Sequence, residues 1–399
     1  MSIINSFPGY EFVKLADGKY HNMFRGTDVG YGGYVFAQPN FYGNVVTLDV
    51  GNMHGASIDE LNKFGKHTQR YRDIRNARMA IKHHDFEAAK NMLDGKLAPY
   101  LSDEKNADDL QKALKLILNS TYGIAAATFE NPLKDPRDTN NIIALRGALF
   151  MRTLQDEVRD RGFTVAHIKT DSIKIPDATP EIINFVIDFG KKYGYEFEHE
   201  STYEKMCLVN DAVFIAKYTS PEKCQEMYGY VPSKNAKHPN EWTATGTQFQ
   251  VPYVFKTLFS HEKIEFSDTC ETKSVTTAMY LDMNEDLPEG EHNYVFVGRV
   301  GQFTPIKPGC GGGELLRYKD GKYSSVTGAK GYRWLESEAV RAMHKEDCVD
   351  KSYYTKLVDA AVDTIRKYVD FDWFASDEPY AGSVPFMNRP IDDDEELPF

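Results

Sequence analysis

The chain has 399 residues, of which 41% are hydrophobic and 27% charged, and its formal net charge is −12. This length predicts two or three subdomains rather than one compact core. The sequence has no apolar run of about 18 residues and no signal-peptide pattern at its start, so we predict neither a membrane span nor secretion. Its five cysteines lie far apart without a CxxC pair, which argues against a disulfide framework or a structural zinc site and favours a reducing cytoplasm.

The acidic balance does not exclude a nucleic-acid partner, because the charges are unevenly distributed. Acidic residues concentrate at 282–291 and in the closing DDDEELPF, whereas Lys and Arg predominate between Lys63 and Lys90. Phosphate contacts come from Lys and Arg. A basic segment in an acidic chain is therefore compatible with a local phosphate site.

In the first half of the chain, strands give way to a long helical region. Residues 1–44 are rich in Gly, Tyr and Phe and predict loops with short strands. The β-branched run at 44–50 predicts a strand that ends near an aspartate. The pattern from 57 to about 118 is helical with one short break, and 141–162 predicts a second long amphipathic helix stopped by Gly162.

The second half begins with a predicted β-hairpin, in which FTVAHI and IKI flank the four-residue turn KTDS at 169–172. A helix at about 179–193 and a strand at 212–218 follow. From about 240 strands and loops predominate, until helical patterns return at 334–344 and 352–369. The glycine-rich GCGGGE lacks the Lys-Ser/Thr of a phosphate-binding loop and predicts a flexible loop.

Two aspartates stand where strands end or turn. Asp49 closes one predicted strand and Asp171 lies in the hairpin turn. Carboxylates on adjacent strands can hold a pair of Mg²⁺ ions, one lowering the pKa of a 3′-hydroxyl and the other neutralising a triphosphate. Taken singly, an Asp after an apolar strand is more often a turn or cap residue.

The helix LQKALKLILNSTYG carries one polar stripe, because Gln111, Lys115 and Asn119 follow each other at intervals of four. A Lys on such a face can meet a triphosphate, and Tyr122 one turn further can pack near a base pair. The alternative is an ordinary amphipathic helix with a solvated face.

The residues of this stripe resemble a known signature. Lys115, Asn119, Ser120, Tyr122 and Gly123 match the K-x-x-x-N-S-x-Y-G motif of family B, phage-type DNA polymerases. LDVGNMHGASI at 48–58 resembles that family's D-x-x-S-L-Y-P-S segment, KTDS its D-T-D-S turn, and the stretch from Gly32 to Tyr42 its G-G-x-V…P…Y segment. The overlap runs from about residue 30 to 218, with the motifs in the family's order.

The resemblance implies an α+β fold, a right-hand polymerase with an antiparallel-sheet palm, helical fingers and a mixed α/β thumb. We expect residues 1–56 to form an N-terminal segment and the first palm strand, 57–123 the fingers, 124–218 the palm and 219–399 a thumb-like region. The expected activity is template-directed DNA synthesis in viral DNA replication, extending a primer 3′-hydroxyl with dNTPs by a two-metal-ion mechanism.

The resemblance also assigns roles to individual residues. The metal ligands are expected to be Asp49, Asp171 and the backbone at Val50, holding two Mg²⁺ ions, with Mn²⁺ as an alternative. The catalytic set is Asp49, Asp171 and Lys115, and the nucleotide contacts are Lys115, Asn119, Tyr122, His54, Arg78 and Lys82. The DNA contacts are Lys169, Lys217, Tyr218, Gly32 and Gly33.

Three departures from the family pattern bear on these roles. His54 stands where the family has the Tyr that excludes ribonucleotides, so we expect its flat ring to act as the sugar gate, the alternative being a packing or capping His. Lys169 replaces the first Asp of D-T-D. It either contacts a primer phosphate or marks an inactive site. Ala216 replaces the first Lys of the family's K-x-Y motif. One of Glu198, Glu200 and Glu204 is a further candidate acid, the alternative being that all three are solvated.

Several expectations concern partners. The segment before Asp49 is too short for a 3′–5′ exonuclease domain, so we expect no proofreading by this chain and a separate exonuclease chain as a candidate partner.

The tail Asp392–Phe399 resembles the acidic tip of bacterial single-stranded-DNA-binding proteins and predicts docking to a replisome protein, unless it only improves solubility. We expect the cytoplasm of an infected bacterial host as the location. The rival functions are a catalytically impaired DNA-binding scaffold and a ribonucleotide polymerase or primase.

Overall fold

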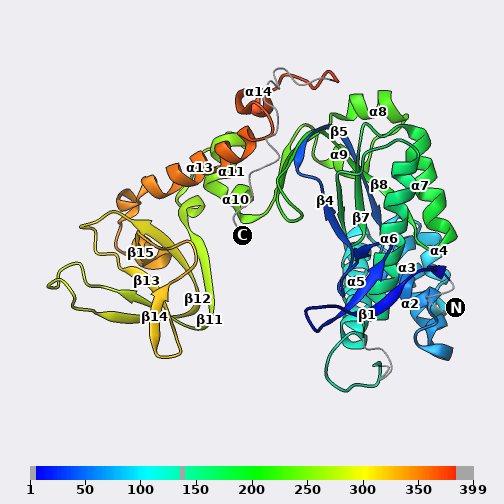
Figure 1. Ribbon diagram of the computed structural model, residues 1–399, viewed down its shortest axis with the longest axis horizontal. Coiled ribbons are helices and arrows are strands. Elements are labelled where there is room, and N and C mark those ends of the chain that lie inside the picture. The colour runs from blue at the N-terminus through cyan, green and yellow to red at the C-terminus, as the bar shows by residue number, and fades with distance from the viewer. Residues whose placement is uncertain (1–5, 135–139, 383–399) are drawn as a thin grey trace. The chain divides into compact units, whose positions relative to one another are not determined.

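The computed structural model describes residues 6–134 and 140–382. The chain divides into two units, one made of Met1–Asp211 with Lys217–Asn240 and the other of Ala212–Ala216 with Glu241–Phe399 (Figure 1). Each unit is mixed α/β with antiparallel strands and has a hydrophobic core of its own. The predicted tail at Asp392–Phe399 lies outside the described residues.

The main sheet of the first unit has the strand order β8-β5-β7-β6-β4, and these neighbours pair antiparallel. Beyond β8, the sheet continues with β9, of which Lys217 and Tyr218 belong to the first unit. The strands are β4 (Val35–Ala37), β5 (Asn40–Val50), β6 (His167–Lys169), β7 (Ser172–Pro176), β8 (Phe197–Leu208) and β9 (Phe214–Tyr218).

Two helices, α6 (Ile142–Asp160) and α7 (Pro180–Lys192), contribute to the core of this unit. The alternation of β5 explains why the core forms on one face of the sheet. Val46, Leu48 and Val50 are buried in the core, whereas Asp49 between them projects from the opposite face. The sequence predictions of a helix ending before Gly162 and of a helix at 179–193 are confirmed.

The helical region between β5 and α6 consists of separate helices rather than one helix with a single break. Asn52, in the left-handed conformation at φ 75°, caps the first helix by accepting a hydrogen bond from the Gly55 backbone N–H. This helix begins at Met53, four residues before the predicted start at 57. The helices are α2 (Met53–Glu60), α3 (Thr68–Lys82), α4 (Phe86–Asn91) and α5 (Glu104–Ala125).

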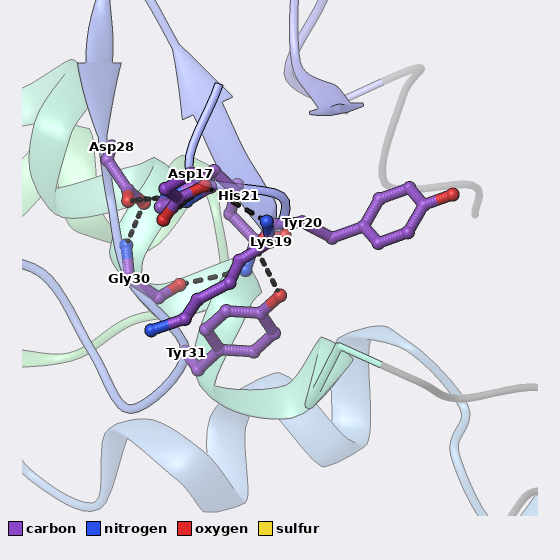
Figure 2. Close-up of polar contacts among 8 residues, drawn as sticks. Asp17, Lys19, Tyr20, His21, Asp28, Gly30 and Tyr31 are labelled. Atoms are coloured by element: carbon purple, nitrogen blue, oxygen red, sulfur yellow. Dashed lines mark hydrogen bonds and ion pairs between the residues drawn. The ribbon is translucent and has the colours of Figure 1, made fainter. Parts of the chain in front are cut away.

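A small N-terminal sheet of β1 (Glu11–Lys14), β2 (Tyr20–Phe24) and β3 (Thr27–Asp28) precedes the main sheet. His21 lies between Asp17 and Asp28, 2.6 Å from the latter, and the Tyr31 hydroxyl donates to the Tyr20 carbonyl (Figure 2). The hydrogen bonds to both carboxylates raise the pKa of His21. These contacts fix the segment that leads into the glycines at 32 and 33.

The second unit is built on a five-stranded antiparallel sheet of order β14-β13-β11-β12-β15. Its core gathers Met279, Phe303, Leu315 and Trp334 on one face. The strands are β11 (Glu271–Asp282), β12 (Tyr294–Ile306), β13 (Glu314–Lys319), β14 (Lys322–Ser325) and β15 (Arg333–Glu336), and β10 (Trp242–Thr245) precedes them.

The helices of the second unit are α10 (Thr247–Gln250), α11 (Pro252–Phe255), a π-helical turn at Lys256–Ser260, α12 (Ser337–Ala342), α13 (Lys351–Arg366) and α14 (Phe371–Ala375). The helix at 352–369 is confirmed. The prediction of strands and loops from about 240 missed the short helices that follow Thr245. The aromatic residues that favour a strand there pack instead on these helical turns, as Phe249 does against Phe259. At 334–344 a strand precedes the helix.

Elsewhere the first unit differs from the sequence prediction in two details. The hairpin turn has two residues rather than four, because Lys169 pairs with Ser172. The long strand β8 was not predicted, since its sequence mixes charged and apolar residues. Among the described residues, no helix is long and apolar enough to span a bilayer, and all five cysteines are free thiols.

Candidate active site

Asp49 and Asp171 lie side by side at one end of the main sheet. Asp49 is paired in register with Ser172, the residue after Asp171. The backbone N–H of Val50 donates to the Asp171 carbonyl at 2.9 Å. Two aspartates that are 122 positions apart in the sequence are thus held together by strand pairing.

The turn that carries Asp171 is fixed from its other side by Gly33. The Thr170 N–H donates to the Tyr34 carbonyl at 3.0 Å, and Thr170 itself has a positive φ of 56°. Gly33 has φ +134°, and a Cβ there would lie 2.9 Å from Thr170 Cγ2. Only glycine permits this approach, which gives the predicted Gly32–Gly33 pair a structural reason.

A third carboxylate enters the site through a β-bulge. In the pairing of β5 with β8, Thr47 faces Ser201 and Leu48 faces His199, so Glu200 is the extra residue. Bulges redirect side chains next to functional sites. Glu200 interacts electrostatically with both Asp49 and Asp171, and it forms an ion pair of 2.9 Å with Lys234.

Neighbouring negative charges oppose the ionisation of both aspartates. Burial, and then the charges of Asp171 and Glu200, raise the pKa of Asp49 to about 7. Burial and Glu200 also raise the pKa of Asp171, although its own backbone hydrogen bond and nearby lysines counteract this. A group of carboxylates with excess negative charge is suited to a divalent cation.

Lys174 supplies a buried positive charge beside these acids. It lies on β7, opposite Thr47, and its side chain is almost fully buried. Burial lowers its pKa to about 8, while Glu200 and Asp49 act to raise it. Sequence reasoning missed this residue, because its position three residues after Asp171 reads as an ordinary strand lysine.

The helical segment presents its predicted cations to the acids. Lys115 is exposed on α5 and interacts electrostatically with Asp171. Lys82 on α3 interacts with Asp49 and forms an ion pair of 2.8 Å with Glu198. Burial acts to raise the pKa of Glu198, but hydrogen bonds from Lys82 and His83 outweigh it and lower that pKa. The helices therefore bring positive charge towards the carboxylates.

Arg78, also on α3, is more buried than expected of a side chain that is free to bind phosphate. Its side chain is buried and its Nε donates to Gln111 Oε1 at 3.4 Å. Burial lowers the pKa of Arg78 and Glu198 acts to raise it. A cavity of about 580 Å³ between α3 and α5 is lined by Lys82 and Gln111 among others, and Asn119 is exposed two turns beyond Gln111.

His54 and Tyr122 form one aromatic pair. Their rings stack at 4.0 Å between centroids and 17° between planes. The hydroxyl of Tyr122 is 3.3 Å from the Asn141 side-chain amide. Burial lowers the pKa of His54, so the imidazole is neutral at physiological pH. The structure thus joins two predicted nucleotide contacts from α2 and α5.

The remaining predicted residues lie in different surroundings. Lys169 is exposed at the end of β6, next to the hairpin turn, and Gly32 is exposed, with nothing within 4 Å of a Cβ added there. Lys217 and Tyr218 are buried on β9, where Tyr218 lies between the rings of Tyr203 and His238. The second pair is therefore placed to stabilise the sheet, and a DNA contact there stays a prediction.

The donor set fits Mg²⁺ held jointly by protein and substrate. Within residues 6–134 and 140–382, no three His, Cys, Asp or Glu side chains are arranged to enclose a metal ion. Mg²⁺ is commonly bound through one or two carboxylates together with substrate phosphates and water. Asp49 and Asp171, which lie side by side and both have raised pKa values, meet that requirement.

Comparisons with known proteins give likenesses to solved structures but no match by sequence. No protein-family model and no curated protein matches the chain. The solved structure of the family B DNA polymerase from the archaeon Pyrobaculum calidifontis aligns over 86% of this chain with 11% identity and a TM-score of 0.45. The alignment covers 48% of that polymerase, so the chain spans about half its length. A likeness this weak does not assign a family.

Proposed function

We propose that the chain is a template-directed DNA polymerase that extends a primer 3′-hydroxyl with deoxynucleoside triphosphates. The observation that carries this proposal is the juxtaposition of Asp49 and Asp171 with Lys115, which comes from a separate helix. Phosphoryl transfer needs carboxylates for metal ions and cations for the charge on the phosphates, with little covalent chemistry. Two Mg²⁺ ions, when bound, would activate the hydroxyl and neutralise the leaving pyrophosphate.

Each side chain then has a defined role. Asp49 and Asp171 would hold the metal ions, and the Val50 carbonyl would be a further ligand. Lys115 offsets charge on the triphosphate as the phosphoryl group transfers, and Lys82 adds to this potential. The stacked rings of His54 and Tyr122 line the sugar and base of the incoming nucleotide, with Asn119 and Arg78 as further contacts.

The test is primer extension on a primed DNA template with Mg²⁺ and all four dNTPs. Asp171→Asn should lose activity by at least about 100-fold, the loss expected when charge stabilisation of a transition state is removed. Lys115→Ala should lose a similar factor. Lys112→Ala is the matched control, because Lys112 is also exposed on α5 but pairs with Asp108, and it should retain full activity.

The scaffold alternative is tested in the same experiment. Lys169 lies next to the turn of Asp171, where an added positive charge competes with a metal ion. Wild-type protein that binds primer–template but extends nothing under Mg²⁺ or Mn²⁺ would replace the polymerase proposal with that of a DNA-binding subunit. Synthesis from ribonucleotides without a primer would instead assign a primase.

The wider setting follows from the family resemblance and is proposed with it. It comprises viral replication in the cytoplasm of an infected bacterium and a replisome protein bound by the tail. A pull-down that is unchanged by deleting Phe399 would remove this partner.

A further inference from the structure

The second unit has a pocket lined by cations and hydroxyls that the proposed active site does not use. Its volume is about 240 Å³, and it lies between β11, β13 and the segment after β14. Two cations, Arg317 and Lys319, and four hydroxyl residues, Ser274, Thr276, Thr277 and Thr327, line it with two valines. No Asp or Glu is among these residues, although the chain has a net charge of −12.

The two cations of the pocket are held without carboxylate partners. Within the described part of the chain, neither Arg317 nor Lys319 forms an ion pair. The Arg317 Nε donates to Ser324 Oγ at 3.0 Å, which orients the guanidinium and leaves its other N–H groups available. Many other exposed lysines of this protein, such as Lys263 with Glu265, do pair with an acid.

The hairpin of β13 and β14 places a third cation on the same face. Lys319 pairs directly with Lys322 across the turn Asp320–Gly321, whose positive φ values of 53° and 78° suit a tight type I′ turn. Paired residues point to the same side of a sheet, and like charges directly opposite each other are destabilising. An anionic ligand would relieve the repulsion between these lysines.

The spacing of the cations favours a chain of phosphates over a single small anion. Arg317 and Lys319 are two residues apart on one strand, about 7 Å along its axis. Lys322 extends the row across the hairpin. A polynucleotide backbone offers regularly spaced negative charges, and hydroxyl side chains of the kind that line the pocket commonly donate to phosphate oxygens.

We propose that this pocket binds backbone phosphates of DNA, so that the second unit contacts the primer–template independently of the active site. The proposal rests on the proposed function for the identity of the nucleic acid. Each cation contributes one phosphate contact, whatever the base sequence, because a backbone carries no sequence information.

The experiment measures binding of a fluorescent primer–template by anisotropy over a series of NaCl concentrations. The double variant Arg317→Ala/Lys319→Ala should bind at least several-fold more weakly, and its slope of log K against log salt should fall by about 2. The matched control Lys351→Ala/Arg366→Ala removes two exposed cations of the same unit from α13 and should leave the slope unchanged. Lys319→Glu should weaken binding further while keeping the backbone intact.

The outcomes separate this proposal from that of the active site. Equal affinity and slope in the wild type and the pocket variants overturn the pocket, even if the protein extends primers normally. If the variant shows the expected fall in slope but the wild type never extends a primer, the polymerase activity alone is overturned. If inorganic phosphate raises the melting temperature of the wild type but not of the variants, while DNA binding is the same in both, the pocket binds a small anion only and the proposal is wrong.

Discussion

Burial and the charges of two neighbouring acids, Asp171 and Glu200, all oppose the ionisation of Asp49. Its pKa is raised from 3.8 to about 7, whereas in the unfolded chain an Asp titrates near 4. Between these values the folded protein holds a proton that the unfolded chain has released. The stability of the metal-free protein therefore falls as pH rises from about 4 to 7.

We predict that Asp49→Asn removes this pH dependence. The variant should be more stable than the metal-free wild type at pH 7.5, by roughly 2–4 kcal/mol, because the energetic penalty of ionising Asp49 disappears. Urea unfolding with EDTA between pH 4 and 8 measures it. Adding Mg²⁺ should stabilise the wild type and leave the variant almost unchanged. Identical pH profiles for the two proteins would contradict the prediction.

We predict that His54 sets the sugar selectivity of the proposed polymerase. Its ring is held flat against Tyr122 and is neutral, so it can block a 2′-hydroxyl by contact. His54→Ala should raise the incorporation of ribonucleotides relative to that of deoxyribonucleotides by at least about 10-fold. This is the discrimination expected from about one steric contact in a pocket. Single-nucleotide extension with dCTP and CTP measures the ratio. His54→Tyr should keep selectivity, and an unchanged ratio in His54→Ala would remove the role.

At the scale of elements, the sequence predicted the strand of Asp49, the hairpin of Asp171 and the helix of Lys115, because each has a local pattern. It could not predict which glutamate joins them. Glu200 enters through a bulge in β8, and a bulge depends on the register between two strands that are far apart in the chain. Lys174 was missed for the same reason, since its neighbours come from strand pairing.

The approach of Gly33 to the hairpin gives a prediction at this scale. Gly33→Ala should displace the Thr170 turn and reduce primer extension by at least about 10-fold, because small misplacements of catalytic groups are costly. It should also destabilise the protein by about 1–3 kcal/mol. Gly32→Ala is the control for stability, since a Cβ added there would meet nothing within 4 Å. Equal activity of Gly33→Ala and the wild type would show that the turn does not depend on this contact.

At the scale of the whole molecule, each unit has its own core, and the three tryptophans, Trp242, Trp334 and Trp373, all belong to the second unit. Tryptophan fluorescence therefore reports the second unit, whereas circular dichroism reports both. We predict that Asp49→Asn shifts the thermal transition seen by circular dichroism and leaves the fluorescence transition in place. A common shift in both signals would mean that the two units unfold as one.

The path of the chain between the units has a consequence for how this protein could be divided. Residues 212–216 belong to the second unit, yet 217–240 return to the first before the chain leaves again at 241. A gene cut after codon 240 would separate the second unit from its residues 212–216, which would remain in the N-terminal fragment. Neither half would be complete, so we expect the two units to be inherited, expressed and evolved together rather than exchanged as modules.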